Sequence, residues 1–294
     1  MTIDERFLID KKAMRLGFER AASTFDNANF LQKEIADRLL SRMDYVKLQP
    51  SLIADLGCRT GYASNQLAAR YKSASVIAVD IAHAMVLKAR GERAWWKRHL
   101  PILDNHPIKP VCGDLEQLPF VDNCIDLVWS NLALHWYDLN KSLASIHRIL
   151  KTEGLFTFTT LGPDSLSELR QVFNDDRYAH VNQFVDMHDI GDALVHAGFA
   201  DPVMDMEMLT ITFDSFVAMF ADLRALGARN RLKGRSEGLL SPRKWAIIER
   251  RYEALRKSGK LPVTIEVIYG HAWKPKPKKL HDGRQVIEFR QPQK

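Results

Sequence analysis

The chain has 294 residues, with 42 Lys and Arg residues against 36 Asp and Glu residues and a formal net charge of +6. A composition of 46% hydrophobic and 27% charged residues is ordinary for a globular protein and excludes disordered, collagen-like and disulfide-scaffold classes. No apolar run approaches the roughly 18 residues of a membrane span. The cysteines have no C-x-x-C spacing, and we interpret them as buried free thiols of a cytoplasmic protein.

The positive charge is concentrated toward the end of the chain. Residues 1–223 carry 23 basic and 30 acidic side chains, whereas residues 224–294 carry 19 basic and 6 acidic ones. A basic segment on an acidic body predicts a localised anionic partner. By charge alone, a nucleic acid, an anionic membrane surface and an acidic protein are all open.

The first part of the chain predicts a helical cap followed by an α/β core. Apolar residues at helical spacing predict a helix over 29–45, with Asn29 as its N-cap, in a cap of residues 1–48. From residue 49 to 213, short apolar runs alternate with helical patterns, which predicts a doubly wound parallel sheet covered on both faces. The strand-like runs are Leu52–Leu56, Val76–Val79, Ile108–Cys112, Ile125–Trp129, Leu155–Thr160, Pro202–Phe213 and Pro262–Tyr269. Helical patterns lie near 61–71, 82–91, 138–150, 164–175 and 188–197.

The alternation ends after residue 213. One helix is predicted over 214–228 with Asp214 as its N-cap, and a second over 241–256, where Ser241 and Pro242 form an Ncap–N1 pair. The basic residues between them predict a loop. Because both helices precede the last strand-like run, we interpret 214–260 as a helical lid inserted between the last two strands of a seven-stranded sheet. Residues 261–273 complete the core, and residues 274–294 form a basic tail.

Two glycines follow the first predicted strand, in the stretch LIADLGCRTG (52–61). At the carboxyl edge of a doubly wound sheet, such a turn lies where ligands bind. Gly57 permits a tight turn and Gly61 lets the next helix pack closely, so that backbone amides face a cofactor. Asp80 ends the second strand in VIAVD, where an acidic residue is the usual partner of ribose hydroxyls.

The spacing separates two kinds of nucleotide cofactor. A dinucleotide site has G-x-G-x-x-G for its pyrophosphate, whereas this loop reads D-x-G-x-x-x-G. Asp55, just before the first glycine, would repel a pyrophosphate but suits the amino group of a methionyl moiety. The pattern therefore favours S-adenosylmethionine, with Asp55, Gly57, Gly61, Asp80 and Ile81 at the cofactor.

Two later strand ends carry polar residues at the same edge. Asp114 and Leu115 follow the third strand in GDLEQLPF and are expected at the adenine, with a loop cap as the alternative for Asp114. The fourth strand continues as DLVWSNLALHW (126–136), where a substrate would meet the methyl group. Asn131 is expected at the cofactor, His135 as a donor to the substrate and Trp136 as an apolar wall. Structural roles are the alternatives for His135 and Trp136.

The ordered set DLGCRTG, VIAVD, GDLEQLPF and DLVWSNLALHW resembles class I S-adenosylmethionine-dependent methyltransferases. Further segments over 18–273, such as FERAASTFDNANFLQKE and LGPDSLSELRQVF, resemble the malonyl-acyl-carrier-protein O-methyltransferase family of biotin synthesis. The resemblance implies a Rossmann-like fold, S-adenosylhomocysteine as product, and methylation of the free malonyl carboxylate on an acyl carrier protein. SLSELR and LALHW also resemble an assembly factor that hydroxylates an arginine, which is the alternative function.

Methyl transfer to the implied substrate depends on positioning of the carboxylate more than on general acid–base catalysis. A malonyl carboxylate is ionised near pH 7 and needs no general base. Arg170, in SLSELR, is expected to hold it bidentately, with a surface ion pair to Glu168 or Asp164 as the alternative. Phe25 and Gln32 are expected in a helix that closes over the cofactor. On the predicted lid, three residues are expected at the phosphopantetheine arm or the carrier protein, with a solvated face as the alternative: Arg224, Arg229 and Asn230.

Arg59 departs from the resemblance, because class I members usually have glycine at the middle of this loop. If the backbone there needs a positive φ, the Cβ brings a steric penalty. The side chain then either points to solvent or weakens cofactor binding and marks a chain with reduced methyl transfer.

The resemblance also reduces the choice among the three classes of anionic partner. Aromatic residues do not interleave with the basic ones as a nucleic-acid stacking platform requires. We therefore expect an acidic carrier protein as the partner, without nucleic acid, membrane or metal. No oligomeric state follows from the sequence.

Overall fold

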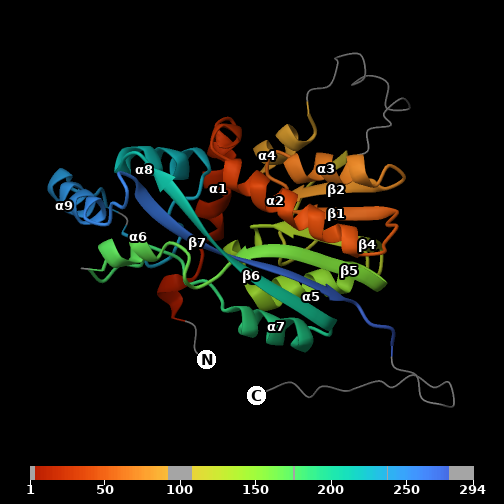
Figure 1. Ribbon diagram of the computed structural model, residues 1–294. Coiled ribbons are helices and arrows are strands. Elements are labelled where there is room, and N and C mark those ends of the chain that lie inside the picture. Colours follow the sequence, from red (N-terminus) through yellow and green to blue (C-terminus); the bar gives the residue numbers. More distant parts are fainter. Residues whose placement is uncertain (1–3, 92–107, 175, 237, 278–294) are drawn as a thin grey trace.

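The structure is a computed structural model that describes residues 4–91, 108–174, 176–236 and 238–277. Within these residues the strands form one seven-stranded sheet in the order β3-β2-β1-β4-β5-β7-β6 (Figure 1). The strands are β1 (Leu52–Leu56), β2 (Ser75–Asp80), β3 (Ile108–Cys112), β4 (Ile125–Asn131), β5 (Leu150–Leu161), β6 (Ala200–Phe213) and β7 (Leu261–Trp273). The predicted α/β class and the seven strand positions are confirmed.

Helices cover both faces of the sheet (Figure 1). The helices are α1 (Lys11–Ala21), α2 (Phe30–Arg42), α3 (Tyr62–Arg70), α4 (His83–Ala89), α5 (Leu139–Ile149), α6 (Ser167–Val172), α7 (Met187–His196), α8 (Phe216–Ala225) and α9 (Pro242–Glu253). Short 3₁₀ turns are η1 (Glu5–Phe7), η2 (Phe25–Asn27), η3 (Met43–Tyr45) and η6 (Leu134–Trp136). Apolar residues of α2 and α3 share a core with one face of the sheet, and those of α5 and α7 share a core with the other.

The last two strands run differently from the predicted parallel sheet. Strands β1 to β5 pair in parallel, whereas β7 pairs antiparallel with both β5 and β6. Phe213 at the end of β6 pairs with Leu261 at the start of β7, so these strands form a hairpin whose connection contains α8 and α9. Antiparallel neighbours need no crossover helix, and the connection is therefore free to leave the sheet.

The N-cap predicted for α8 is wrong by one residue. The Ser215 hydroxyl accepts a hydrogen bond from the amide of Ala218 at 3.1 Å, so Ser215 caps the helix. Asp214 forms an ion pair with Lys260 instead. Ser241 accepts from the amide of Lys244 and is followed by proline at the first helical position, which confirms the predicted start of α9.

Earlier in the chain, one helix start is confirmed, one helix is shorter than predicted and one helix is not predicted. Asn29 occupies the N-cap position of α2 as predicted, although its side chain makes no cap hydrogen bond and donates to Asp26 at 3.0 Å. Helix α6 is shorter than the predicted 164–175. Helix α1 is not predicted from the sequence, although the Asp10 carboxylate caps it by accepting from the amide of Ala13 at 2.9 Å.

The N-terminal segment and the loop that follows α8 pack against each other. The amide of Asp10 donates to the carbonyl of Arg231 at 2.7 Å, and the amide of Lys233 donates to Leu8 at 2.8 Å. Gly227 has a φ of 72°, and a Cβ there would lie 2.9 Å from the Cβ of Ala21 in α1. The predicted cap and the predicted lid therefore meet along a close seam (Figure 1).

Within the described ranges, no helix is long and apolar enough to cross a membrane. Cys58 is a buried free thiol as expected, but Cys112 is exposed because it ends the edge strand β3, and Cys124 is only partly buried. Residues 278–294 of the predicted basic tail lie outside the described residues.

Candidate active site

The glycine loop between β1 and α3 lies at the carboxyl edge of the sheet. The amide of Gly57 donates to the carbonyl of Val79 at 2.8 Å, which fixes the loop to the end of β2. Gly57 and Gly61 have φ values of 75° and 88°. A Cβ on Gly57 would lie 2.4 Å from the Cβ of Ala133, and one on Gly61 would lie 2.7 Å from the Cα of Ala89. Both the tight turn and the close packing predicted for these glycines are confirmed.

Asp55 is a buried carboxyl at the start of this loop. One oxygen accepts a hydrogen bond from the Ser64 hydroxyl at 2.5 Å. Burial raises the pKa of Asp55 to about 7, and the nearby Asp80 carboxylate adds to the effect. The group is therefore close to half-protonated at neutral pH, and a cation placed beside it would ionise it.

Arg59 does not point to solvent. Its φ is 51°, and its side chain is only 12% exposed. Its amide and its Nη1 donate to Oδ2 of Asp80 at 3.1 and 3.2 Å. The guanidinium carbon lies 3.6 Å from the centre of the Phe18 ring, a cation–π contact. The other Asp80 oxygen accepts from the amide of Ala82 at 2.9 Å, so both oxygens of this carboxylate are engaged.

Helix α1 lies over the ends of β2 and β3. Lys11 forms ion pairs with Asp114 and Glu116 at 2.6 and 2.7 Å. Asp114 also accepts from the amide of Glu116, as the loop-cap alternative predicts. Leu115 is fully buried, and Ile81 packs against the α1 cluster. The residues predicted at the adenine therefore lie beneath the N-terminal segment.

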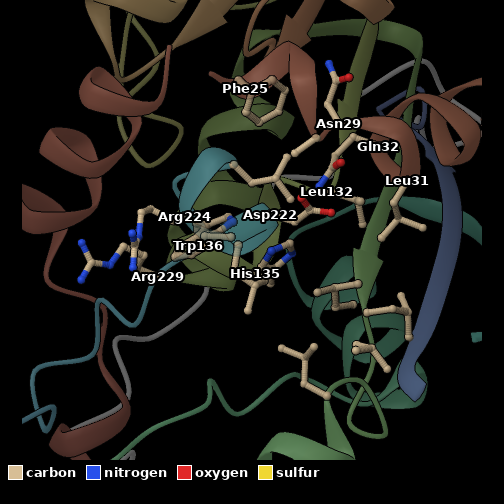
Figure 2. Close-up of a pocket in the computed structure, with 18 of the residues that line it drawn as sticks. Phe25, Asn29, Leu31, Gln32, Leu132, His135, Trp136, Asp222, Arg224 and Arg229 are labelled. Atoms are coloured by element: carbon tan, nitrogen blue, oxygen red, sulfur yellow. The ribbon is translucent and has the colours of Figure 1, made fainter. Parts of the chain in front are cut away.

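A cavity of about 470 Å³ runs from the glycine loop to α8 and the loop after it (Figure 2). Of the predicted site residues, it is lined by Asp55, Gly57, Asn131, His135, Trp136, Arg224, Arg229 and Asn230, together with Phe25, Gln32 and Arg59. The predicted site residues Gly61, Asp80, Ile81, Asp114, Leu115 and Arg170 do not line it.

His135 is partly buried in the wall of this cavity, with its Nδ1 fully covered (Figure 2). Burial lowers its pKa to about 3, assisted by the charge of Arg59, so the imidazole is neutral at pH 7. Its Nδ1 has no hydrogen-bond partner among the described residues. Trp136 is also buried and packs edge-to-face on Phe18 at 5.2 Å between ring centres. His135 therefore presents an Nδ1 atom without a hydrogen bond beside the apolar ring of Trp136.

Asn131 and Gln32 connect β4 to the N-terminal segment. The Asn131 amide donates to the carbonyl of Gln32 at 2.9 Å, and its Oδ1 accepts from the Thr159 hydroxyl at 2.7 Å. Both polar atoms of Asn131 are thus held by protein. The Oε1 of Gln32 is buried without a hydrogen-bond partner in the described part of the chain. Gln32 therefore offers an acceptor at the cavity wall.

Arg170 is engaged with the backbone. Its guanidinium donates to the carbonyls of Asn182 at 3.2 Å, Ser165 at 2.5 Å and Pro163. The predicted alternative partner, Glu168, accepts from the amide and hydroxyl of Thr264. In this arrangement the Arg170 side chain holds two loop segments together, and its guanidinium carbon lies 5.9 Å from the ring centre of Phe184, which lines the cavity.

The residues of the predicted lid differ in what they contact. Asn230 donates to the carbonyl of Ala179 at 2.6 Å and accepts from the amide of Leu232 at 3.0 Å, so its side chain fixes the loop. Arg224 and Arg229 are exposed at the cavity rim (Figure 2).

The sequence patterns did not predict the part of the site that aromatic residues of α1, α8 and α9 supply. Phe18 lines the cavity from α1, and Phe220 and Trp245 line it from α8 and α9. The buried Met14, Phe18 and Ala21 stand at i, i+4 and i+7, a helical spacing that would have located α1.

Residues 54–158 match the family model described as a methyltransferase domain. The YcgJ protein of Bacillus subtilis has the same fold, with a TM-score of 0.56 at 15% identity, over 82% of this chain and 99% of that one. The sheet order, the glycine loop and this match define a class I methyltransferase, with a Rossmann-like α/β fold.

Two curated relatives are each described as a malonyl-[acyl-carrier protein] O-methyltransferase. The protein of Gallionella capsiferriformans is 49% identical over 96% of this chain and 97% of its own length. That of Nitrosospira multiformis is 49% identical over 92% of this chain and 91% of its own length. The chain belongs to the malonyl-[acyl-carrier protein] O-methyltransferase family.

Proposed function

We propose that this protein transfers a methyl group from S-adenosylmethionine to the free carboxylate of malonyl on an acyl carrier protein, an early step of biotin synthesis in the cytoplasm. The observation that carries the proposal is one continuous cavity that joins the Asp55–Gly57 loop, the unused imidazole of His135 and the basic rim. The names of the relatives support the same substrate.

The residues of the loop fit this cofactor. Asp55 offers a buried carboxyl to the ammonium of the methionyl part, and Gln32 offers an unused carbonyl oxygen in the same cavity. Asp80 is suited to ribose hydroxyls once Nη1 of Arg59 gives up its bond, and Asp114 and Leu115 are suited to the adenine. When bound, S-adenosylmethionine supplies a methyl group activated by a sulfonium.

The chemistry places few demands on proton transfer. The malonyl carboxylate is ionised near pH 7, and the neutral His135 can donate a hydrogen bond to it without protonating it. Trp136 closes an apolar wall beside His135, which keeps water from the carboxylate. Positioning and exclusion of water contribute up to about 7–11 kcal/mol in favourable cases.

The remaining predicted residues support this arrangement. We assign Arg170 to positioning of the loops it bridges, in place of holding the carboxylate. The cap (1–48) and the lid (214–260) cover the core (49–213 and 261–273), and Arg224 and Arg229 face the carrier. The names of the relatives do not favour the arginine-hydroxylating assembly factor or a methyltransferase disabled by Arg59.

The test is a transfer assay with labelled S-adenosylmethionine. Malonyl-loaded carrier protein should take up label that mild base removes, and unloaded carrier should take up none. His135→Phe keeps an aromatic ring and removes the donor, so it should lower kcat at least tenfold, roughly the value of one lost hydrogen bond to a charged group. Label on unloaded carrier or on nucleic acid, or tight cofactor binding without transfer, would contradict the proposal.

A further inference from the structure

Asp222 on α8 places a carboxylate in the wall of the cavity, where Figure 2 shows it pointing inward. Its neighbours on the helix that also line the cavity include the apolar residues Met219, Phe220 and Leu223. Within the described ranges, the half-buried Asp222 side chain takes part in no hydrogen bond or ion pair. A carboxylate among apolar side chains is costly unless a cation or a donor compensates it, so this position points to a charged ligand.

Other acceptors without donors share the cavity with Asp222. Among the described residues that line it, Asp55 and Asp222 are the two acidic ones. Asp55 accepts from the Ser64 hydroxyl and forms no ion pair in the described part of the chain. The Oε1 atom of Gln32 is buried without a donor from any described residue. Uncompensated acceptors on several sides of one cavity indicate a ligand that brings positive charge.

The positive side chains that line the cavity do not compensate Asp222. Arg59 forms its ion pair at the end of β2, and Lys33 lies over an aromatic ring at 5.5 Å. Arg224 and Arg229 are exposed at the rim. The charge that matches Asp222 must therefore come from a bound molecule.

S-adenosylmethionine carries two positive charges, an ammonium and a sulfonium joined by a short carbon chain. The proposed function places the ammonium at Asp55 and Gln32, and the carboxylate that receives the methyl group at His135. The sulfonium belongs between these points, because it carries the methyl group that must reach the substrate. In the view of Figure 2, the Asp222 carboxylate lies between the side chains of Gln32 and His135, and all of these residues line the same cavity.

We propose that Asp222 pairs with the sulfonium of bound S-adenosylmethionine and so raises the affinity for this cofactor relative to its product, S-adenosylhomocysteine. The inference rests on the proposed function for the identity of the cofactor. Methyl transfer forms a C–O bond to the carboxylate and breaks the C–S bond, whose electron pair stays on sulfur and leaves it neutral. The attraction to Asp222 is lost in the same step. Because this contact is strongest before transfer, it contributes to cofactor affinity and to release of the product.

The experiment is calorimetry of both compounds with the protein in the absence of substrate. Asp222→Asn keeps the shape of the side chain and removes its charge, so it should raise the Kd for S-adenosylmethionine about tenfold and leave that for S-adenosylhomocysteine unchanged. Asp222→Glu keeps the charge and should retain most of the affinity difference. The matched control is Asp192→Asn on α7, which removes one exposed negative charge outside the cavity and should behave as the wild type.

Sinefungin separates charge from shape, because it carries an amine in place of the methylsulfonium. Asp222→Asn should weaken sinefungin as it weakens S-adenosylmethionine. Equal weakening of S-adenosylmethionine and S-adenosylhomocysteine would overturn the proposal, because Asp222 would then contact the ammonium that both compounds carry. Unchanged affinity for all three compounds would also overturn it, since the carboxylate would then be merely solvated.

Failure of the proposed function gives a different result. If malonyl-loaded carrier protein takes up no label but the Kd shift is confined to S-adenosylmethionine and sinefungin, the pairing with Asp222 stands and malonyl is the wrong substrate. If the wild type binds none of the three compounds, both the pairing and the proposed function are overturned.

Discussion

At Arg59, the strain of a left-handed backbone is opposed by the favourable contacts of the side chain. A left-handed backbone at a residue with a Cβ costs about 1 kcal/mol. Against this, its guanidinium compensates the fully buried Asp80 and packs on Phe18. Breaking a buried ion pair costs about 3 kcal/mol or more, so the ion pair outweighs the strain.

Arg59→Gly should therefore destabilise the empty protein by about 2 kcal/mol, even though glycine suits the backbone. It should also remove one of the two donors to Oδ2 of Asp80 and so leave an acceptor position for the cofactor, while the backbone amide of residue 59 still donates to that oxygen. Saturating S-adenosylmethionine should then raise the Tm of the mutant more than that of the wild type in differential scanning calorimetry. Equal Tm increases would contradict a competition between Arg59 and the cofactor for Asp80.

A second prediction for a single residue concerns Asp55 and the pH dependence of cofactor affinity. Its pKa is raised to about 7 in the empty protein, whereas the cofactor ammonium favours the ionised form. Below pH 7 binding must release a proton, so affinity should fall by up to about tenfold for each pH unit and level off above pH 7. Calorimetric titrations from pH 5.5 to about 8.5 measure this, and Asp55→Asn should remove the pH dependence. The same raised pKa means that Asp55 stabilises the empty fold less as the pH rises toward 7.

At the scale of elements, the strands and helices of the core follow from the alternation of apolar runs. Strands β1 and β3 have the predicted bounds, because each is a short apolar run that ends at a turn. The direction of β7 could not be predicted, because apolar pattern carries no information about strand orientation. The partners of Arg59 and Arg170 could not be predicted either, since they come from segments distant in sequence or from loop backbone.

The start of α8 gives a direct test of local structure. Ser215→Ala removes the hydroxyl that caps the helix and should cost about 1 kcal/mol, or about 2–4 °C in Tm. Asp214→Ala is the matched control, because its exposed ion pair with Lys260 contributes little. Thermal unfolding of both variants distinguishes them. A larger Tm decrease in Asp214→Ala would place the cap where the sequence alone predicted it.

At the scale of the whole molecule, part of the positive charge of residues 224–294 lies around the opening of the cavity. Arg224 and Arg229 lie at the cavity rim, and Arg231 lies behind it against α1. An acidic carrier protein that approaches the cavity through this rim would meet Arg224 and Arg229 first. Electrostatic steering of this kind increases the association rate and weakens with salt.

Charge reversal at Arg224, Arg229 and Lys233 should therefore raise the KM for malonyl-loaded carrier protein at least tenfold at low salt. The effect should shrink as the salt concentration rises, and cofactor affinity should not change. Steady-state kinetics over a salt series, with cofactor binding measured in parallel, checks both statements. A KM that responds to neither the reversal nor the salt would mean that the basic rim does not guide the carrier.

The methyl group is expected on the malonyl carboxylate, and mass spectrometry of the phosphopantetheine arm released from the carrier protein after reaction can locate it. We expect one added methyl group, located on the distal carboxylate by fragmentation and lost in mild base with recovery of malonyl. A methyl group on the pantetheine chain or on a side chain of the carrier, or an unmodified arm after full turnover of the cofactor, would contradict this expectation.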